Sequence, residues 1–324
     1  MARLILRRLA QAAAVVLAAA TLTFALLHLA PGDPIARTLE HPGVSAEVRE
    51  RMRRSYGLDR PVPEQYLRYL ASVARGDLGH SFSLRRPVAN ALLDALPNTL
   101  VLMATTLLLS FALGIALGVY QALRRGSVGD RVFGTISLAF YSLPDFWLAL
   151  VAVLVFAYWI PVLPAGGAVD PVLHDYLGPL GRFGDRLRHL ALPALTLTLL
   201  SAAGIARFQR AALLDVADED FVRTARAKGV GPRAVVWRHL LRNAVVPTVT
   251  LLGLSLPALV GGAAVVEKVF SWPGLGLLAV NAIDTRDYPL VTGAVIVASA
   301  AVAVGSLAAD ALQALVDPRV RGGK

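Results

Sequence analysis

The chain has 324 residues, of which 56% are hydrophobic and only 17% are charged, and its formal net charge is +10 at pH 7. About 25% of the residues in a soluble globular domain are charged, so this composition excludes an ordinary soluble protein. A basic protein that binds nucleic acid needs its Lys and Arg residues on an exposed surface, whereas here they lie between long apolar stretches. The chain contains no cysteine, which excludes disulfides, thiolate metal sites and cysteine nucleophiles.

Six apolar stretches are near or above the roughly 20 residues that a helix needs to cross a bilayer. They predict transmembrane helices at Leu9–Ala30, Asn98–Leu123, Val132–Trp159, Leu190–Ala206, Ala244–Val266 and Pro289–Ala309. The fourth stretch is the shortest. The first stretch has an alternative as a cleaved signal peptide, because three arginines precede it. The apolar region of a signal peptide is only about 7 to 15 residues long, so a retained helix is favoured.

The distribution of Lys and Arg predicts the orientation in the membrane. With both termini in the cytoplasm, 17 basic residues lie on the inner side and five lie in the two short outer loops. Short cytoplasmic loops carry an excess of Lys and Arg, so this orientation is favoured. The remaining ten basic residues lie in the segment Pro31–Pro97, which is too long for the rule to apply.

The long outer segment Pro31–Pro97 reads as short helices separated by turns. The first is expected over Ser45–Tyr56, and the second runs from Pro63 to a stop at Gly76. A third, Val88–Leu96, is expected to lie along the membrane surface and to lead into the second span across Pro97. Two roles are open for this segment: a structural cap over the helix ends, or a docking surface for an external partner.

The inner loop between the fourth and fifth spans, residues 215–243, predicts two short helices with a turn between them. An acidic cluster begins the first helix and basic residues end it, which complements the helix dipole, and Gly229 stands where a helix stop belongs. The second helix, from Arg233 to Leu241, is amphipathic, with Val236 and Leu240 on one side. Such a projection offers a grip for a cytoplasmic partner, or it lies as a basic helix on anionic lipid.

Motifs for catalysis are missing from the sequence. None of the three lysines follows the glycine spacing of a phosphate-binding loop, so the chain is not expected to hydrolyse ATP by itself. The six histidines are scattered without metal-ligand spacing, and no serine nucleophile elbow occurs. We therefore expect no catalytic, cofactor or metal site in this chain.

Only two ionisable residues fall within or at the end of the predicted spans, Asp145 and Asp310. Such residues are costly in a membrane and are candidates for function. Asp145 follows Pro144, where a broken helix would expose backbone to a water-filled translocation path. The alternative is that Asp145 caps a proline kink. Asp310 lies near the inner end of its span, within reach of the lipid headgroups.

Short motifs, in order along nearly the whole chain, resemble the dipeptide, oligopeptide and nickel permease family. Members of this family are the membrane subunits of bacterial ABC importers, and the likeness is specifically to the first-encoded subunit of each pair. The motifs are Pro31-Gly32-Asp33-Pro34, Gly57-Leu58-Asp59 with Gly76-Asp77-Leu78-Gly79, Arg86-Pro87-Val88, Leu143-Pro144-Asp145-Phe146-Trp147, Arg223-Thr224-Ala225-Arg226-Ala227-Lys228-Gly229, Arg242-Asn243-Ala244-Val245-Val246-Pro247, Phe270-Ser271-Trp272-Pro273-Gly274-Leu275-Gly276, Arg286-Asp287-Tyr288-Pro289 and Asp317-Pro318-Arg319-Val320-Arg321.

This resemblance implies an all-α integral membrane protein of the type I ABC importer kind, with six transmembrane helices. Its parts would be residues 1–30, an extracytoplasmic helical segment 31–97 and a permease core 98–324 that contains the coupling loop 215–243. That loop resembles the EAA loop, which docks into a groove of the ATPase subunit. The implied coupling residues are Arg223, Thr224, Ala225, Lys228, Gly229 and Pro232.

Two departures from the general importer pattern indicate which subfamily the chain resembles. Arg223 stands where the general importer pattern has Glu, and the spacing from Gly229 to Pro247 is longer than in sugar importers; both are similar to peptide permeases. Ala225 and Gly229 are the positions carried over most directly, because a small residue would let the helix enter a groove and glycine ends it.

The implied function is a non-catalytic permease subunit that imports short peptides across the inner membrane of a bacterium or archaeon. The implied partners are a second permease subunit, two ATPase subunits that bind ATP and magnesium, an extracytoplasmic binding protein and membrane lipid, with no nucleic acid. Other members of the family carry nickel chelates, glutathione or oligosaccharides, and these substrates stay open. So do an ion-coupled secondary transporter with Asp145 as its titrating group, and a membrane scaffold.

Overall fold

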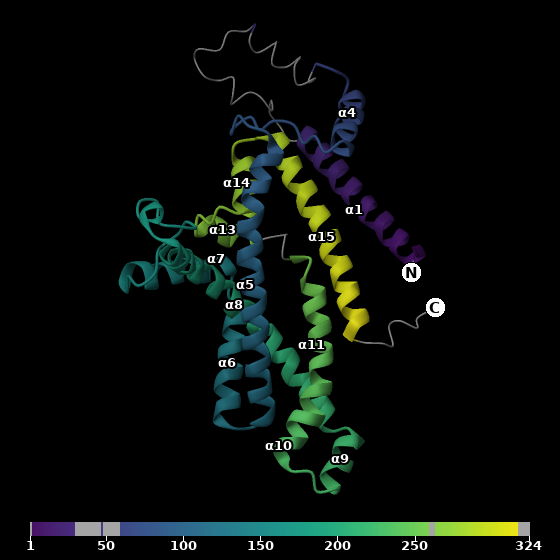
Figure 1. Ribbon diagram of the computed structural model, residues 1–324, viewed down its shortest axis with the longest axis vertical. Coiled ribbons are helices and arrows are strands. Elements are labelled where there is room, and N and C mark those ends of the chain that lie inside the picture. The colour runs from purple at the N-terminus through teal and green to yellow at the C-terminus, as the bar shows by residue number, and fades with distance from the viewer. Residues whose placement is uncertain (1, 30–46, 48–58, 259–262, 317–324) are drawn as a thin grey trace. The chain divides into compact units, whose positions relative to one another are not determined.

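The computed structural model describes residues 2–29, 47, 59–258 and 263–316, without the side chains of residues 2–9, 12, 27 and 310–316. The described residues form helices and one isolated β-bridge, between His80 and Pro87, and no strand. The elements in chain order (Figure 1) are α1 (Ala2–Leu29), α4 (Val62–Ala74), α5 (Val88–Leu123), α6 (Val128–Ser142), α7 (Asp145–Val153), the π-helix η1 (Leu154–Trp159), the 3₁₀-helix η2 (His174–Tyr176), α8 (Pro179–Ala217), α9 (Asp220–Ala227), α10 (Pro232–Ala234), the π-helix η3 (Val235–Leu240), α11 (Leu241–Ser255), α13 (Ala264–Val269), α14 (Leu275–Asp284) and α15 (Tyr288–Val316).

The chain forms two compact units. The first unit contains Met1–Thr99, Val260–Ala264 and Pro273–Val304, and the second contains Leu100–Leu259, Val265–Trp272 and Gly305–Lys324. Helices α5 and α15 contribute to both units. The loop expected to face the ATPase belongs entirely to the second unit.

In the part of the chain that the structure describes, three helices are long and apolar enough to cross a membrane: α5, α8 and the Tyr288–Ala309 part of α15. Helices α6 and α7 pass the same test of length and composition only together, and the 104° bend between them is that of a broken span or of a re-entrant loop. The described apolar part of α1, Ala13–Leu26, is shorter, and α11 ends at Ser255 within the expected fifth span. An all-helical fold is confirmed, while the number of six spans and the orientation of the termini stay predictions.

The expected third span, Val132–Trp159, is not straight. The chain bends by 104° between α6 and α7, and Leu143 at the break is extended, with φ −79° and ψ 138°. Proline lacks an amide hydrogen and disfavours helical backbone in the residue before it, so Pro144 ends α6 and α7 begins after it. The expected break beside Pro144 is confirmed.

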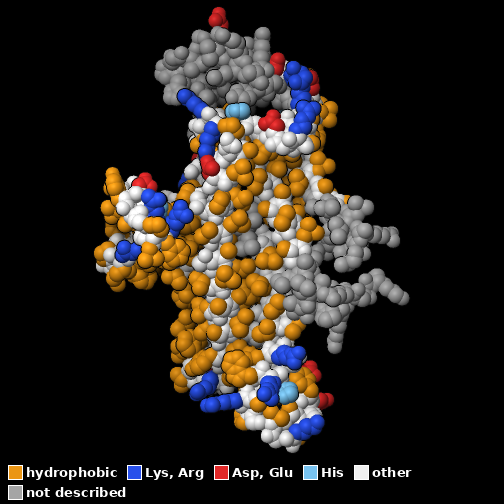
Figure 2. Space-filling model, in the orientation of Figure 1, with side chains coloured by type: hydrophobic (Ala, Val, Ile, Leu, Met, Phe, Trp, Pro, Cys, Tyr) orange, Lys and Arg blue, Asp and Glu red, His pale blue; other side chains and the backbone are white. Residues whose placement is uncertain are grey.

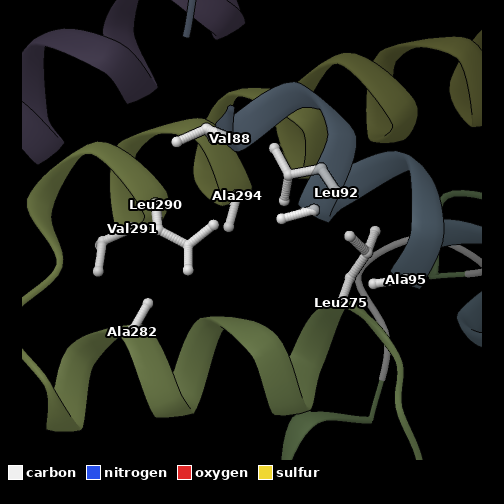
Figure 3. Packing of buried hydrophobic residues seen from close by; sticks show 9 residues of the cluster. Val88, Leu92, Ala95, Leu275, Ala282, Leu290, Val291 and Ala294 are labelled. Atoms are coloured by element: carbon white, nitrogen blue, oxygen red, sulfur yellow. The ribbon is translucent and has the colours of Figure 1, made fainter. Parts of the chain in front are cut away.

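The prediction of a separate surface helix at Val88–Leu96 is wrong. Helix α5 runs for 36 residues through Pro97, because its first turns are held in place by the core of the first unit. That core lies between α5, α14 and α15 (Figure 3), and its buried residues are Val88, Ala91, Leu92, Ala95, Leu275, Ala282, Leu290, Val291 and Ala294. The side-chain amide of Asn98, one residue after the proline, donates to the carbonyl of Pro273 at 2.9 Å. Helix α8 is likewise longer than the predicted fourth span, with 39 residues.

The outer-segment helix predicted from Pro63 to Gly76 is confirmed as α4, and Gly76 has the positive φ, +76°, of a helix stop. Helix α4 packs on α1: the hydroxyl groups of Thr21 and Tyr66 lie 2.7 Å apart, and Phe24 contacts the rings of Tyr66 and Tyr69. Burial raises the pKa of Tyr69 to about 12. The helix expected over residues 45–56 lies outside the described residues.

A buried carboxylate fixes the short outer loop before α5. Asp287 is fully buried and accepts hydrogen bonds from both the hydroxyl (2.7 Å) and the amide (2.8 Å) of Ser83. The hydroxyl of Ser81 donates to the same oxygen at 2.5 Å, and the amide of Leu290 donates to the other oxygen at 3.2 Å. Because a buried carboxylate needs several donors, the loop and the start of α15 are held in one arrangement.

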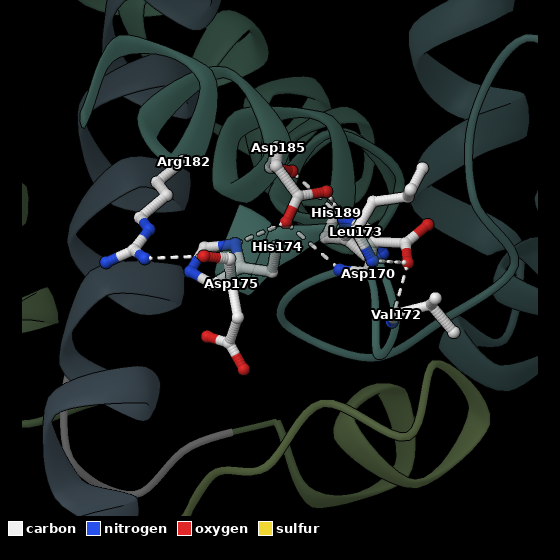
Figure 4. A network of polar contacts seen from close by, with 8 residues as sticks. All are labelled: Asp170, Val172, Leu173, His174, Asp175, Arg182, Asp185 and His189. Carbon is white, nitrogen blue, oxygen red and sulfur yellow. Dashed lines mark hydrogen bonds and ion pairs between the residues drawn. The ribbon is translucent and has the colours of Figure 1, made fainter. Parts of the chain in front are cut away.

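A second polar network orders the loop between η1 and α8 (Figure 4). Asp185 of α8 lies between two imidazoles: its carboxylate is 2.6 Å from Nδ1 of His174 and 3.1 Å from Nδ1 of His189. Asp170 accepts hydrogen bonds from the amides of Val172 (2.9 Å) and Leu173 (2.8 Å). These two amides hold the pKa of the Asp170 carboxyl below its usual range.

Candidate functional site

The inner loop of the second unit folds into a helical elbow, defined here as residues 218–243 (Figure 1). Helix α9 forms its first arm, and α10, η3 and the start of α11 form its second. The two predicted short helices and the turn between them are confirmed, with the second arm continuing directly into α11.

Helix α9 has one buried face and one exposed face. Val222 is fully buried and Ala225 is 6% exposed, and Val222 belongs to a cluster with Ala122, Leu213, Val235, Leu240 and Ala244. This cluster joins the elbow to the end of α5, the last turns of α8 and the start of α11. On the other face, Phe221 is 42% exposed, and Arg223 and Ala227 are exposed as well. The exposed face of α9 is therefore supported from behind by an apolar core.

A glycine-dependent stop ends α9. The amide of Gly229 donates to the carbonyl of Arg226 at 3.0 Å, and the amide of Val230 donates to the carbonyl of Ala225 at 3.2 Å. This pair of hydrogen bonds is the Schellman motif, in which the residue after the cap adopts a left-handed conformation. Gly229 has φ +78°, so the role predicted for it as a helix stop is confirmed in structure.

The second arm presents a basic and aromatic surface. Gly231 precedes α10, Pro232 opens it, and the π-helix η3 buries Val235 and Leu240. Trp237 is 73% exposed, and Arg238 and Arg242 are exposed beside it in sequence. Figure 2 shows Lys and Arg side chains gathered over the elbow.

Two consecutive residues of α8, Gln209 and Arg210, join α8 to α11 and to α6 next to the elbow. Gln209 is fully buried and is bonded to α11, accepting from the hydroxyl of Thr248 at 2.5 Å and donating to the carbonyl of Ala244 at 3.3 Å. Arg210 forms a bidentate pair with Asp130 of α6, with both N–O distances 3.1 Å.

Helix α5 crosses α8 at the same two residues. A Cβ on Gly118 would lie 2.8 Å from Cβ of Gln209 and 3.0 Å from the amide nitrogen of Arg210. A glycine there permits close helix packing, so three helices converge on these two residues of α8.

The predicted coupling residues do not all occupy one surface. Arg223, Thr224, Lys228, Gly229 and Pro232 are exposed, as docking requires. The expectation that the small side chain of Ala225 lets the helix enter a partner's groove is not met, because Ala225 is buried against the chain's own core. The small side chain of Ala225 packs within the elbow.

The residues predicted for a translocation path are at the bend between α6 and α7. Pro144 precedes the first residue of α7, Asp145, whose carboxylate accepts from the amide of Phe146 at 2.7 Å. The N-cap residue of α7 is Pro144, and no side-chain hydrogen bond caps the helix, so both expected roles of Asp145, in a path or as a kink cap, stay predictions. Asp310 lies within α15, and the structure does not describe its side chain.

The surface of α6 is strongly apolar, as Figure 2 shows. Val132, Phe133 and Ile136 are 38–47% exposed, and soluble monomers rarely expose a contiguous apolar surface of this kind. Together with the long apolar helices, this surface agrees with a membrane protein.

Two family models cover almost the whole sequence. Residues 114–322 match the binding-protein-dependent transport system inner membrane component family, and residues 1–103 match the N-terminal region of such membrane components. The chain belongs to this family. It is therefore a membrane permease component of a binding-protein-dependent transport system.

Relatives of known name agree with this assignment. The di/tripeptide transport system permease protein DppB of Pseudomonas aeruginosa is 39% identical, with 93% of each chain covered. The glutathione transport system permease protein GsiC of Escherichia coli is also 39% identical, over 93% of this chain and 92% of the relative. A chain of the MetNI methionine ABC transporter, in an inward facing conformation, matches 70% of this chain and 96% of its own length with a TM-score of 0.52 and 20% identity. This last likeness supports the fold of the ABC importer permease.

The contacts of Gln209 and Arg210 and the exposure of Trp237 were not predicted from the sequence. Asp130 and Arg210 are 80 positions apart, and Gln209 and Thr248 are 39 apart, so no local pattern links them. Among the residues of these contacts, Arg210 carried a usable signal, because an arginine shortly after the apolar span of α8 needs a partner or a headgroup. Trp237 carried a signal as a large aromatic among arginines.

Proposed function

We propose that this chain is the permease subunit of an ATP-driven importer of short peptides. The observation that carries the proposal is membership in the binding-protein-dependent transport family, together with 39% identity to a di/tripeptide permease over 93% of each chain. The similar permease GsiC is named for glutathione transport, and glutathione is a short peptide derivative, which favours peptides over nickel chelates or oligosaccharides.

In this proposal the chain pairs with a second permease subunit and with two ATPase subunits, which bind the ATP and magnesium. A binding protein delivers the peptide to the outer face. Both termini and the elbow face the cytoplasm, as the excess of 17 inner over five outer basic residues favours. The membrane is the inner membrane of a bacterium or archaeon.

The elbow is the contact through which the ATPases act. Its exposed residues Arg223, Thr224, Lys228, Gly229 and Pro232 would touch the ATPase, while the buried Ala225 keeps α9 seated. A ligand shifts a conformational equilibrium only by its differential affinity for the two states. ATP binding would therefore drive transport because the ATPase pair holds the elbow differently in the inward-open and outward-open states.

Uptake by the reconstituted importer tests this function. Proteoliposomes that contain this chain, its partner permease and both ATPases, with the binding protein outside and ATP inside, are expected to accumulate a labelled dipeptide. Uptake driven by a proton gradient in the absence of ATP would instead support an ion-coupled transporter, and the absence of uptake and of ligand-stimulated ATP hydrolysis would support a scaffold. Mass spectrometry of the ligand retained by the binding protein identifies the substrate, and a nickel chelate or an oligosaccharide there would refute the peptide assignment.

A further inference from the structure

The ion pair between α8 and α6 is a bidentate contact with a mostly buried carboxylate. Nε of Arg210 lies 3.1 Å from Oδ1 of Asp130, and Nη2 lies 3.1 Å from Oδ2. The side chain of Asp130 is 10% exposed and that of Arg210 is 33% exposed. A second donor, the amide of Gly126, lies 3.0 Å from Oδ2. Paired hydrogen bonds between guanidinium and carboxylate fix the orientation of both side chains.

Because Asp130 lies at the start of α6, the ion pair attaches the whole of α6 to α8. Asp130 is in the first turn of α6, and its amide donates to the hydroxyl of the N-cap residue Ser127 at 3.2 Å. The carboxylate is therefore held rigidly at the inner end of α6. One helix length away, α6 ends at the 104° bend to α7, so a displacement at Asp130 moves the helix that leads to this bend.

The position of Arg210 links the same pair to the elbow. Arg210 lies ten positions before the first residue of α9, and Leu213, in the next turn of α8, is in the apolar cluster that supports Val222 of α9. The neighbouring Gln209 holds α11 through Thr248. Movement of α9 therefore reaches α8 and α11 by direct packing, but it reaches α6 through contacts of α8 such as the Arg210–Asp130 pair.

A further contact joins α8 to the other end of α6, near its last residue Ser142. The guanidinium of Arg207 lies over the ring of Tyr141, 5.4 Å from its centroid. Arg207 is exposed, and a cation–π contact at an exposed site is weak. The bidentate pair, with its mostly buried carboxylate, is thus the contact of the two that is able to transmit a displacement.

We propose that Arg210 and Asp130 are positioning residues for energy coupling, which make α6 follow α8 when an ATPase displaces the elbow. This inference rests on the proposed function, because it assigns the pair to the transmission step of ATP-driven import. Neither residue touches the substrate or the nucleotide. Loss of the pair leaves the ATPase able to hydrolyse ATP but disconnects hydrolysis from the movement of α6.

The test measures dipeptide uptake and ATP hydrolysis in the same proteoliposomes, which contain the complete importer. Arg210→Gln and Asp130→Asn are each expected to lower the peptide transported per ATP hydrolysed at least fivefold, with ATP hydrolysis retained. The double variant is expected to be no worse than either single variant, because residues that act as one unit are not additive. The matched control is Arg131→Gln, which removes an exposed charge next to Asp130 and is expected to leave the ratio unchanged.

The outcomes separate this inference from the proposed function. Wild-type vesicles without ATP-dependent uptake refute the proposed function itself. Wild-type uptake combined with an unchanged ratio in both single variants overturns the role of the pair. Uptake and hydrolysis that fall in parallel also overturn it, because they indicate a purely structural contact. If Arg210→Gln does not assemble, Arg210→Lys replaces it: lysine is a point charge without the guanidinium fork, so an intermediate ratio supports the proposal and a wild-type ratio contradicts it.

Discussion

The stop at the end of α9 gives the sharpest prediction about the elbow, because its energetic cost is purely conformational. At Gly229 φ is +78°, and a Cβ there would meet no atom within 4 Å. Gly229→Ala therefore introduces no clash, but it forces an ordinary residue into the left-handed region, which costs about 1–2 kcal/mol. A cost of this size changes the equilibrium between the closed and the opened stop by a factor of about 5–30.

Hydrogen exchange of the complex in detergent measures this opening directly. The amide of Val230 donates to the carbonyl of Ala225 only while the stop is closed, so its exchange is expected to accelerate by about 5- to 30-fold in Gly229→Ala. Gly229→Asn is expected to have a smaller effect, because asparagine adopts left-handed backbone more readily. Peptide uptake by the reconstituted importer is expected to fall in the same order.

Gly231 supplies a matched control two residues away. It is also exposed and also has open space around its Cβ position, but its φ is −60°, which alanine adopts without strain. Gly231→Ala is expected to leave the exchange of the Val230 amide near the wild-type rate. Equal acceleration in the two alanine variants, or none in Gly229→Ala, would refute the assignment of the stop to left-handed backbone.

Three further perturbations have definite expected outcomes. Ala225→Leu overpacks the core behind α9 and is expected to lower stability by about 1–3 kcal/mol, seen as faster hydrogen exchange across the elbow. Ala227→Leu on the exposed face should leave hydrogen exchange unchanged and lower only the affinity for the ATPase. The reverse pattern would contradict the assignment of the buried and exposed faces of α9. Asp287→Ala removes the acceptor that Ser81 and Ser83 share and is expected to destabilise the first unit by about 1–3 kcal/mol for each buried donor left unsatisfied. The loss is seen as a lower midpoint of thermal unfolding. An unchanged midpoint would contradict the stabilising role of Asp287. The folded-state pKa of Asp170 is lowered, so the stability that its carboxylate contributes is present above the unfolded pKa of about 3.9 and is lost as the pH falls through the lower folded value. The difference in thermal midpoint between wild type and Asp170→Ala should therefore shrink from pH 5 to pH 3. A difference that is independent of pH would contradict this direction of the pKa shift.

The sequence by itself determined the class of the protein and the local structure of its inner loop. Apolar stretches of about 20 residues have few solutions other than membrane helices, so composition was enough to establish the class. The acidic start of α9, Gly229 as its stop and Pro232 at the start of the next arm depend on neighbours within a few residues. Such local rules of capping and backbone conformation can be read along the chain.

Only the tertiary structure decided which face of each helix is buried and which distant residues meet. Ala225 was expected to face a partner and instead packs inside the elbow, because the side that α9 presents depends on α8, η3 and α11. Helix α5 continues through Pro97 because the core of the first unit holds its first turns. The pairing of Arg210 with Asp130 depends on how α6 lies against α8, and helix packing of this kind is set by shape complementarity over the whole unit rather than by spacing in the sequence.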